Sequence, residues 1–148
     1  SSLNLDNSVS HHLYYCIIMS QMSFYDCSKL DSITIPAKVT SIGSNAFTSC
    51  TSLSEIIIPD GVTIINERTF YSCTSLTSIT IPDSVTSIEQ GAFRSCTALP
   101  LITIPDTVTS IEKEAFYSCT ALESIIIPDG IISIAEFIFS NCNSLTSV

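Results

Sequence analysis

A single spacing of 23 residues recurs along the sequence and constrains the fold more than any other feature. It is kept by several apolar columns and by a repeated Ile-Pro pair, such as Ile35-Pro36 and Ile58-Pro59. The phenylalanine column is Phe24, Phe47, Phe70, Phe93, Phe116 and Phe139; the cysteine column is Cys27, Cys50, Cys73, Cys96, Cys119 and Cys142; the leucine column is Leu30, Leu53, Leu76, Leu99, Leu122 and Leu145. Because one such unit cannot bury its apolar side chains alone, the pattern predicts coils that stack into a solenoid.

Within one repeat, the sequence predicts a coil with three sides. Residues 78–81 alternate polar and apolar side chains, which favours a short strand with its isoleucines pointing inward. Pro82 cannot donate to a hydrogen-bond ladder, so we expect the strand to end there and a Pro-Asp turn to follow. Residues 85–88 form a second extended run, and we expect residues 89–95 to form a one-turn helix that points Phe93 inward.

These residues carry a resemblance to a known family. Leu30 to Cys50 reads LDSITIPAKVTSIGSNAFTSC, which resembles the BspA-like class of leucine-rich repeats over roughly residues 14–148. The resemblance implies a leucine-rich-repeat solenoid of parallel short β-strands with turns and one-turn helices, in about six stacked coils. It also implies a surface or secreted protein of a bacterium or protist, in which such repeats are associated with adhesion and binding.

The whole chain, residues 1–148, is predicted to be one solenoid domain. We interpret residues 1–23 as a degenerate N-terminal coil and residues 24–148 as regular repeats that are truncated at the C-terminus. Because the sequence opens without Met, we expect a piece of a longer chain. Pro100, just before the fourth expected strand, and Phe137 in the last coil depart from the repeat pattern.

The charge balance argues against two classes of function. Charged residues make up only 13% of the sequence, and the formal net charge is −9. Nucleic-acid binding is disfavoured, because basic side chains must neutralise the phosphates. No apolar run reaches the roughly 20 residues that a membrane-spanning helix needs. Serine and threonine fill the polar positions instead, which predicts a neutral surface rich in hydroxyl groups.

The cysteines, seven in number, are interpreted as buried free thiols. Six share one register, so neighbours are expected one coil apart, about 4.8 Å. Parallel inward side chains hold the Cβ atoms at that separation, which is wider than a disulfide prefers. A straight row also cannot bring four sulfurs around one zinc ion. Cys16 takes the valine position of the first coil and is assigned to the core as well.

No cofactor or metal site is predicted. A row of four aspartates could bind Ca²⁺ between stacked carboxylates, but each Asp follows Pro, which is typical of turns. The row is Asp60, Asp83, Asp106 and Asp129. His11 and His12 lack a spaced partner for a metal site. No nucleophile–base pair or glycine-rich phosphate loop appears, so the chain is predicted not to be an enzyme.

The outward positions of the expected strands form the candidate binding face. They are Ser32 and Thr34, Glu55 and Ile57, Ser78 and Thr80, Leu101 and Thr103, and Ser124 and Ile126. A regular threonine array would indicate ice binding, but Glu55 and Leu101 interrupt it. Small hydroxyls with isolated aliphatics suit a protein or glycan partner, contacted by Ser78, Thr80, Leu101, Thr103, Ile57 and Ile126. The first hypothesis is therefore a non-enzymatic interaction and adhesion module, extracellular or at the cell surface.

The alternative hypothesis is a structural subunit that assembles head to tail into an extracellular fibre. The sequence stops at Val148, where the next strand would begin, and both ends continue the apolar inner row. Apolar side chains and open backbone in matching orientation make a contact that repeats without closing. The candidate self-association residues are Cys16, Met19, Phe137, Ile138, Leu145 and Val148.

Overall fold

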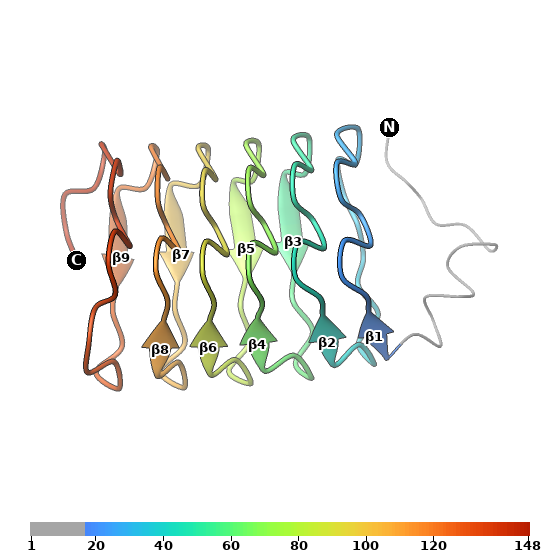
Figure 1. Ribbon diagram of the computed structural model, residues 1–148, viewed down its shortest axis with the longest axis horizontal. Coiled ribbons are helices and arrows are strands. Elements are labelled where there is room, and N and C mark those ends of the chain that lie inside the picture. Colours follow the sequence, from blue (N-terminus) through green and yellow to red (C-terminus); the bar gives the residue numbers. More distant parts are fainter. Residues whose placement is uncertain (1–16) are drawn as a thin grey trace.

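The computed structural model describes residues 17–148, which wind into one solenoid of stacked coils (Figure 1). In each coil the chain rises along the side that faces the viewer, crosses the top, descends on the far side and turns at the bottom. We call these the front side and the back side. The sequence predictions for His11, His12 and Cys16 lie outside the described residues, as does most of the predicted N-terminal coil.

Two rows of short parallel strands run along the solenoid. The front row contains β1 (Ile18–Met19), β2 (Ser41–Ile42), β4 (Ile64–Ile65), β6 (Ser87–Ile88) and β8 (Ser110–Ile111). The back row contains β3 (Glu55–Ile57), β5 (Ser78–Thr80), β7 (Leu101–Thr103) and β9 (Ser124–Ile126). Paired strands keep the 23-residue register, so that Ser87 lies opposite Ser110 and Ile56 opposite Ile79. The predicted solenoid of parallel short strands is confirmed.

The back row is divided into two sheets, and Pro100 accounts for the division. On the front, β1 pairs with β2, and β4, β6 and β8 form a three-stranded sheet, whereas on the back β3 pairs with β5 and β7 with β9. The residue just before a back strand normally donates its backbone N–H to the carbonyl of the equivalent residue in the preceding coil. Thr77 N–H bonds to Ser54 O in this way (2.9 Å), and Glu123 N–H bonds to Pro100 O (3.0 Å). Pro100 has no N–H to give to Thr77 O, so the ladder is interrupted between β5 and β7.

The predicted strand at residues 32–34 is absent, and this prediction is wrong. A hollow of about 500 Å³ is lined by residues 32–35 of this segment and by residues 55–60, which include β3. Parallel pairing needs backbones about 4.8 Å apart. The bond from Ser54 N–H to Asp31 O (3.2 Å) joins the two coils at the start of these segments, and beyond it they are not paired as strands.

Turns replace the predicted one-turn helices, and no helix occurs within residues 17–148. Two residues of each turn segment have left-handed backbone, such as Gly91 (φ 61°) and Ser95 (φ 63°). Ala92 N–H bonds to Glu89 O inside the turn (3.2 Å), but Phe93 N–H donates to Ala115 O of the next coil (2.8 Å). Because alternate N–H groups bond to the next coil, they are not available for the i to i−4 bonds of an α-helix.

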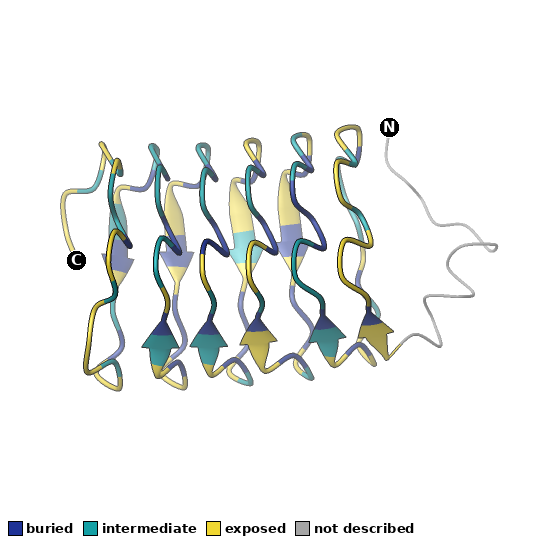
Figure 2. Cartoon of the chain, in the orientation of Figure 1, coloured by how far each residue is buried: buried dark blue, intermediate teal, exposed yellow. Residues whose placement is uncertain are grey.

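The phenylalanine column forms the centre of the core, as the sequence predicts. Neighbouring rings stack with centroids 5.4 to 5.9 Å apart and nearly parallel planes. Phe47, Phe70, Phe93 and Phe116 are fully buried. Along β3 and β7 the burial alternates from exposed to buried to exposed, which Figure 2 shows as a change of colour along each strand. Only one side of each back strand therefore faces the core.

Candidate binding faces

Large aliphatic side chains stand on the outer side of the back strands. Ile57 on β3 is 69% exposed, Leu101 on β7 is 59% exposed and Ile126 on β9 is 78% exposed. The residue between Leu101 and Thr103, Ile102, is buried, because successive side chains of a strand point to opposite faces. The strand pattern thus turns these three aliphatics toward solvent, where a polar residue would be expected.

Hydroxyl residues occupy the rest of this face. Ser78 and Thr80 on β5 and Thr103 on β7 are exposed. Ile79, between Ser78 and Thr80, is only half-buried, and it lies where β5 and β7 are not paired. All six candidate contact residues predicted from the sequence therefore lie exposed on the back side, and one of them, Ile57, helps to line the hollow.

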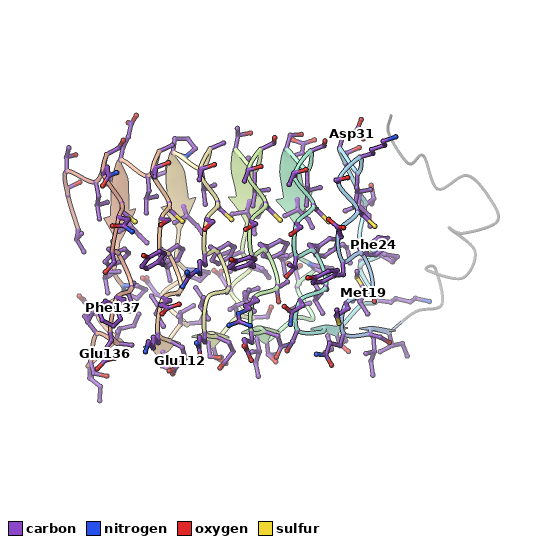
Figure 3. All side chains as sticks on the ribbon, turned by 45° about the horizontal axis from the view of Figure 1, so that its top comes forward. Met19, Phe24, Asp31, Glu112, Glu136 and Phe137 are labelled. Carbon is purple, nitrogen blue, oxygen red and sulfur yellow. The ribbon has the colours of Figure 1, made fainter. Side chains whose placement is uncertain are left out.

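The candidate self-association residues differ in burial. Met19 and Ile138 are buried, Leu145 is half-buried, and Cys16 lies outside the described residues. Phe137 and Val148 remain 55% and 71% exposed. Met19 and Phe137 lie toward opposite ends of the solenoid (Figure 3). The Nζ atom of Lys113 lies 5.5 Å from the centroid of the Phe137 ring, a cation–π contact with the last coil.

The cysteine column is structural in its contacts. Each buried thiol donates to a phenylalanine carbonyl of the preceding coil, as Cys73 Sγ does to Phe47 O at 3.1 Å. Burial raises the pKa of the Cys50 and Cys96 thiols from 9.0 to about 12, because desolvation disfavours the thiolate. These thiols are protonated at neutral pH and are poor nucleophiles. In the part of the chain that the structure describes, no group of three or more His, Cys, Asp or Glu could hold a metal ion.

One further column on the front side was missed from the sequence. It directly follows the phenylalanines and reads Tyr25, Thr48, Tyr71, Arg94 and Tyr117. The guanidinium carbon of Arg94 lies 4.3 Å from the Tyr117 ring centroid and 5.9 Å from that of Tyr71. Arg94 also forms an ion pair with Glu114 of the next coil. The sequence signal that could have revealed this column is the Phe-Tyr pair, which returns in every second repeat.

A family model described as BspA type leucine rich repeat region matches six copies over residues 17–146. No curated protein matches the chain significantly. Over residues 17–148, no helix is long and apolar enough to cross a membrane.

Three crystal structures of leucine-rich-repeat proteins resemble this one. The protein from T. pallidum is 34% identical with a TM-score of 0.86, and the match covers 88% of this chain and 61% of that one. The protein from Bacteroides ovatus is 40% identical with a TM-score of 0.83, covering 86% of this chain and 33% of that one. A leucine rich cell surface protein from Faecalibacterium prausnitzii is 26% identical with a TM-score of 0.58, covering 88% and 50%. The chain thus spans less than two thirds of each of these proteins.

Proposed function

Because this chain belongs to the BspA-type leucine-rich-repeat family, we propose that it is a non-enzymatic interaction and adhesion module, secreted or held at a cell surface. The family match supports an interaction role, since stacked repeats present an extended surface to partners. The surface location is supported by the similar structure from Faecalibacterium prausnitzii, which is named as a cell surface protein. The thiols of Cys50 and Cys96, whose raised pKa keeps them protonated at neutral pH, support a role without covalent chemistry at these positions.

The observation that carries this proposal is the exposure of Ile57, Leu101 and Ile126 on the back side. Apolar side chains that stay in water on a strand face gain free energy when a partner covers them, about 25 cal/mol per Å² buried. Aliphatic side chains that stand exposed on a strand face therefore favour a contact surface. The small hydroxyls between them allow a partner backbone to approach closely and to form hydrogen bonds at the same surface.

We assign a protein partner to the back side. The hollow beside β3 is lined by apolar residues, which include Ile33 and Ile57, and also by Glu55. Its volume of about 500 Å³ accommodates one or two inserted side chains of a protein ligand. An aliphatic or aromatic anchor in this hollow, with the neighbouring Ile57 packed against it, would supply the buried centre that protein interfaces need.

A triple variant that borrows residues from other coils tests this proposal. Ile57→Thr and Ile126→Thr copy Thr80 and Thr103, and Leu101→Ser copies Ser78, so each replacement already occupies the same place in the repeat. Beads coated with the 148-residue chain would be scored for adhesion to cultured cell layers and to purified matrix proteins. We expect adhesion of the wild-type chain and a loss of at least about ten-fold in the triple variant.

The control is Ile64→Ser on the front side. Ile64 is 40% exposed, and its equivalents in neighbouring coils are Ser41 and Ser87, so the change is matched in chemistry and in position. It should leave adhesion unchanged. If the triple variant adheres as well as the wild-type chain does, or if the wild-type chain does not adhere at all, the back side is not the adhesive surface.

The alternative proposal is head-to-tail assembly into a fibre. It is supported by exposed apolar side chains in the first and last described coils, where Ile17 and Ile18 are 58% and 61% exposed and Phe137 and Val148 are 55% and 71% exposed. Light scattering of the 148-residue chain at increasing concentration should show growing polymers. Phe137→Asn, which copies Asn45, together with Val148→Lys should abolish them. Strictly monomeric scattering of the unmodified chain would exclude the fibre.

A further inference from the structure

A second hollow opens on the front side, far from the back strands. It has a volume of about 350 Å³ and is lined by residues of four successive coils: Tyr25, Asn45, Thr48, Arg68, Tyr71 and Arg94. Thr48 stands in the column that carries tyrosine in the coils on either side of it. It is 4% exposed and leaves a low floor between Tyr25 and Tyr71. Those tyrosines are two coils apart, about 10 Å at the usual strand spacing.

The floor of this hollow is held in place by hydrogen bonds. Thr48 Oγ1 donates to Arg68 O at 2.8 Å and approaches Asn45 Oδ1 at 3.3 Å. Asn45 and Arg68 both have left-handed backbone, with φ of 58° and 52°, which turns them outward at the same place in successive coils. The equivalent residue of the next coil is Gly91, so no side chain fills the space beside Arg68.

The two arginines of the hollow are differently engaged. Arg94 is paired with Glu114 and lies over the Tyr117 ring, so its charge is largely neutralised. Arg68 has only a loose ion pair, with 3.8 Å between its Nη1 atom and Glu67 Oε1, and both side chains are 49% exposed. A contact this long and exposed contributes little free energy. The Arg68 guanidinium is therefore the group able to accept a new carboxylate through two parallel hydrogen bonds.

The remaining lining fits a sugar ring better than a bare anion. Tyrosine rings pack against apolar C–H faces and still offer a hydroxyl group, and the Asn45 amide can both donate and accept hydrogen bonds. The hollow lies at the lower end of the volumes found for small-molecule sites. The net charge of −9 repels a polyanion, so a ligand with one negative charge is favoured over a highly charged chain.

We propose that this hollow binds the terminal acidic sugar of a glycan, a monosaccharide with one carboxylate such as a uronic or sialic acid. Arg68 holds the carboxylate, Tyr25 and Tyr71 flank the ring, and Asn45 bonds ring hydroxyls. Arg94 lines one wall and, through Glu114 and Tyr117, stays fixed in place. The site lies on the front side and does not depend on the protein-binding role proposed for the back side.

Titration of the 148-residue chain with free sugars tests the site, with NMR shift changes and calorimetry as readouts. The probes are glucuronic acid and N-acetylneuraminic acid, with glucose and acetate as single-feature controls. We expect an acidic sugar to bind at least about ten-fold more tightly than glucose and than acetate, because each control lacks one of the two recognised features.

Replacements copied from equivalent positions of the repeat identify the residues. Arg68→Asn copies Asn45 and so retains a residue that tolerates the left-handed backbone, while Tyr71→Thr copies Thr48. Each should weaken acidic-sugar binding about ten-fold or more with little change in melting temperature. Lys113→Gln, which removes a cation outside the hollow, and the back-side triple variant should bind as the wild-type chain does. Arg68→Lys should restore part of the affinity.

Three outcomes would overturn the proposal. Neither acidic sugar binds; or glucose or acetate binds as tightly as the acidic sugars do; or Arg68→Asn binds the acidic sugars unchanged. Unchanged binding by the back-side triple variant, together with loss in Arg68→Asn, would place sugar binding on the front side even if the proposed adhesive role fails.

Discussion

The front and back sides of this solenoid are built from the same repeat but differ in continuity. On the front the strands form two sheets, β1–β2 and β4–β6–β8, but turn N–H groups bond each coil to the next, as Phe47 does to Thr69 O and Phe93 to Ala115 O. On the back, Pro100 separates the β3–β5 sheet from the β7–β9 sheet. Residues 32–34, which lie one coil before β3, are not paired with β3. The two most exposed aliphatics of the strands, Ile126 and Ile57, also lie on the back side.

This difference shows how a repeat protein can separate stability from recognition. The front side is cross-linked from coil to coil by backbone hydrogen bonds, so its geometry is fixed and suits a small, preformed hollow. The back side has fewer such links, so its strands can adjust to a large partner. The missing N–H of Pro100 and the unpaired residues 32–34 together make the two sides unequal.

The largest expected effect is a loss of stability when the phenylalanine column behind the front turns is interrupted. Phe93 is fully buried, and its ring stacks on Phe70 and Phe116 with centroid distances of 5.5 and 5.4 Å. Phe93→Ala should lower the free energy of unfolding by about 3–5 kcal/mol, because it leaves a cavity and removes both ring contacts. Urea denaturation followed by circular dichroism measures this loss.

The matched control is Thr86→Ala on the outer surface of the same coil. Its hydroxyl donates to Thr63 O at 3.2 Å, but the residue is exposed and water can replace the bond. The expected loss is no more than about 0.5 kcal/mol. Losses of similar size in the two variants would mean that the inward and outward columns are assigned incorrectly.

A second effect should appear at high pH and originates in the cysteine column. The pKa of Cys50 and of Cys96 is raised from 9.0 to about 12 by burial, so the folded state binds protons more tightly than the unfolded state does. Their contribution to stability is therefore complete below pH 9 and is lost as the pH rises toward 12. Urea midpoints should fall across this range.

The double variant Cys50→Ala with Cys96→Ala isolates this contribution. It should be less stable than the wild-type chain at neutral pH, because it loses two buried side chains that donate to Phe24 O and Phe70 O. Its midpoint should nevertheless fall less between pH 9 and pH 12. An equally steep fall in the variant would assign the pH dependence to other groups.

The smallest expected effect on stability comes from replacing Pro100, and it tests what divides the back side into two sheets. Pro100→Thr copies Thr77 and supplies the missing N–H to Thr77 O. A new hydrogen bond adds about 0.5–1.5 kcal/mol to the free energy of unfolding. Loss of the rigid proline makes the unfolded chain more flexible, which subtracts about 0.4–1 kcal/mol. We expect a stability gain below about 1 kcal/mol. Slower amide exchange in β5 would show that the two back sheets have joined, and unchanged exchange would mean that Pro100 does not cause the division.

The 23-residue period was sufficient to predict the solenoid, the parallel register and the inward phenylalanines. The turn at residues 89–95, where a one-turn helix was predicted, could not be read from the period. Alternate N–H groups of this segment, such as that of Phe93, bond to the next coil and not within the segment. The missing strand at residues 32–34 escaped prediction for a similar reason, since the residues themselves follow the repeat and the separation arises between coils.

The two candidate sites also differ in how far the sequence could predict them. The outward aliphatics of the back side follow from strand alternation, which the sequence shows directly. The front hollow depends on Thr48 being short where Tyr25 and Tyr71 are long, and on Gly91 leaving space beside Arg68. These are differences between repeats, and they acquire meaning only when the coils are stacked.

Residue-resolved native-state hydrogen exchange tests the contrast between the two sides most directly. Ile58 N–H donates to Thr80 O at 3.0 Å, whereas Ile81, its equivalent one coil later and also buried, has no backbone acceptor across the division between β5 and β7 within residues 17–148. We expect the Ile81 amide to exchange much faster than those of Ile58 and of Phe93 on the front. If Ile81 is as strongly protected as Ile58, the back side is continuous and the contrast between the two sides is contradicted.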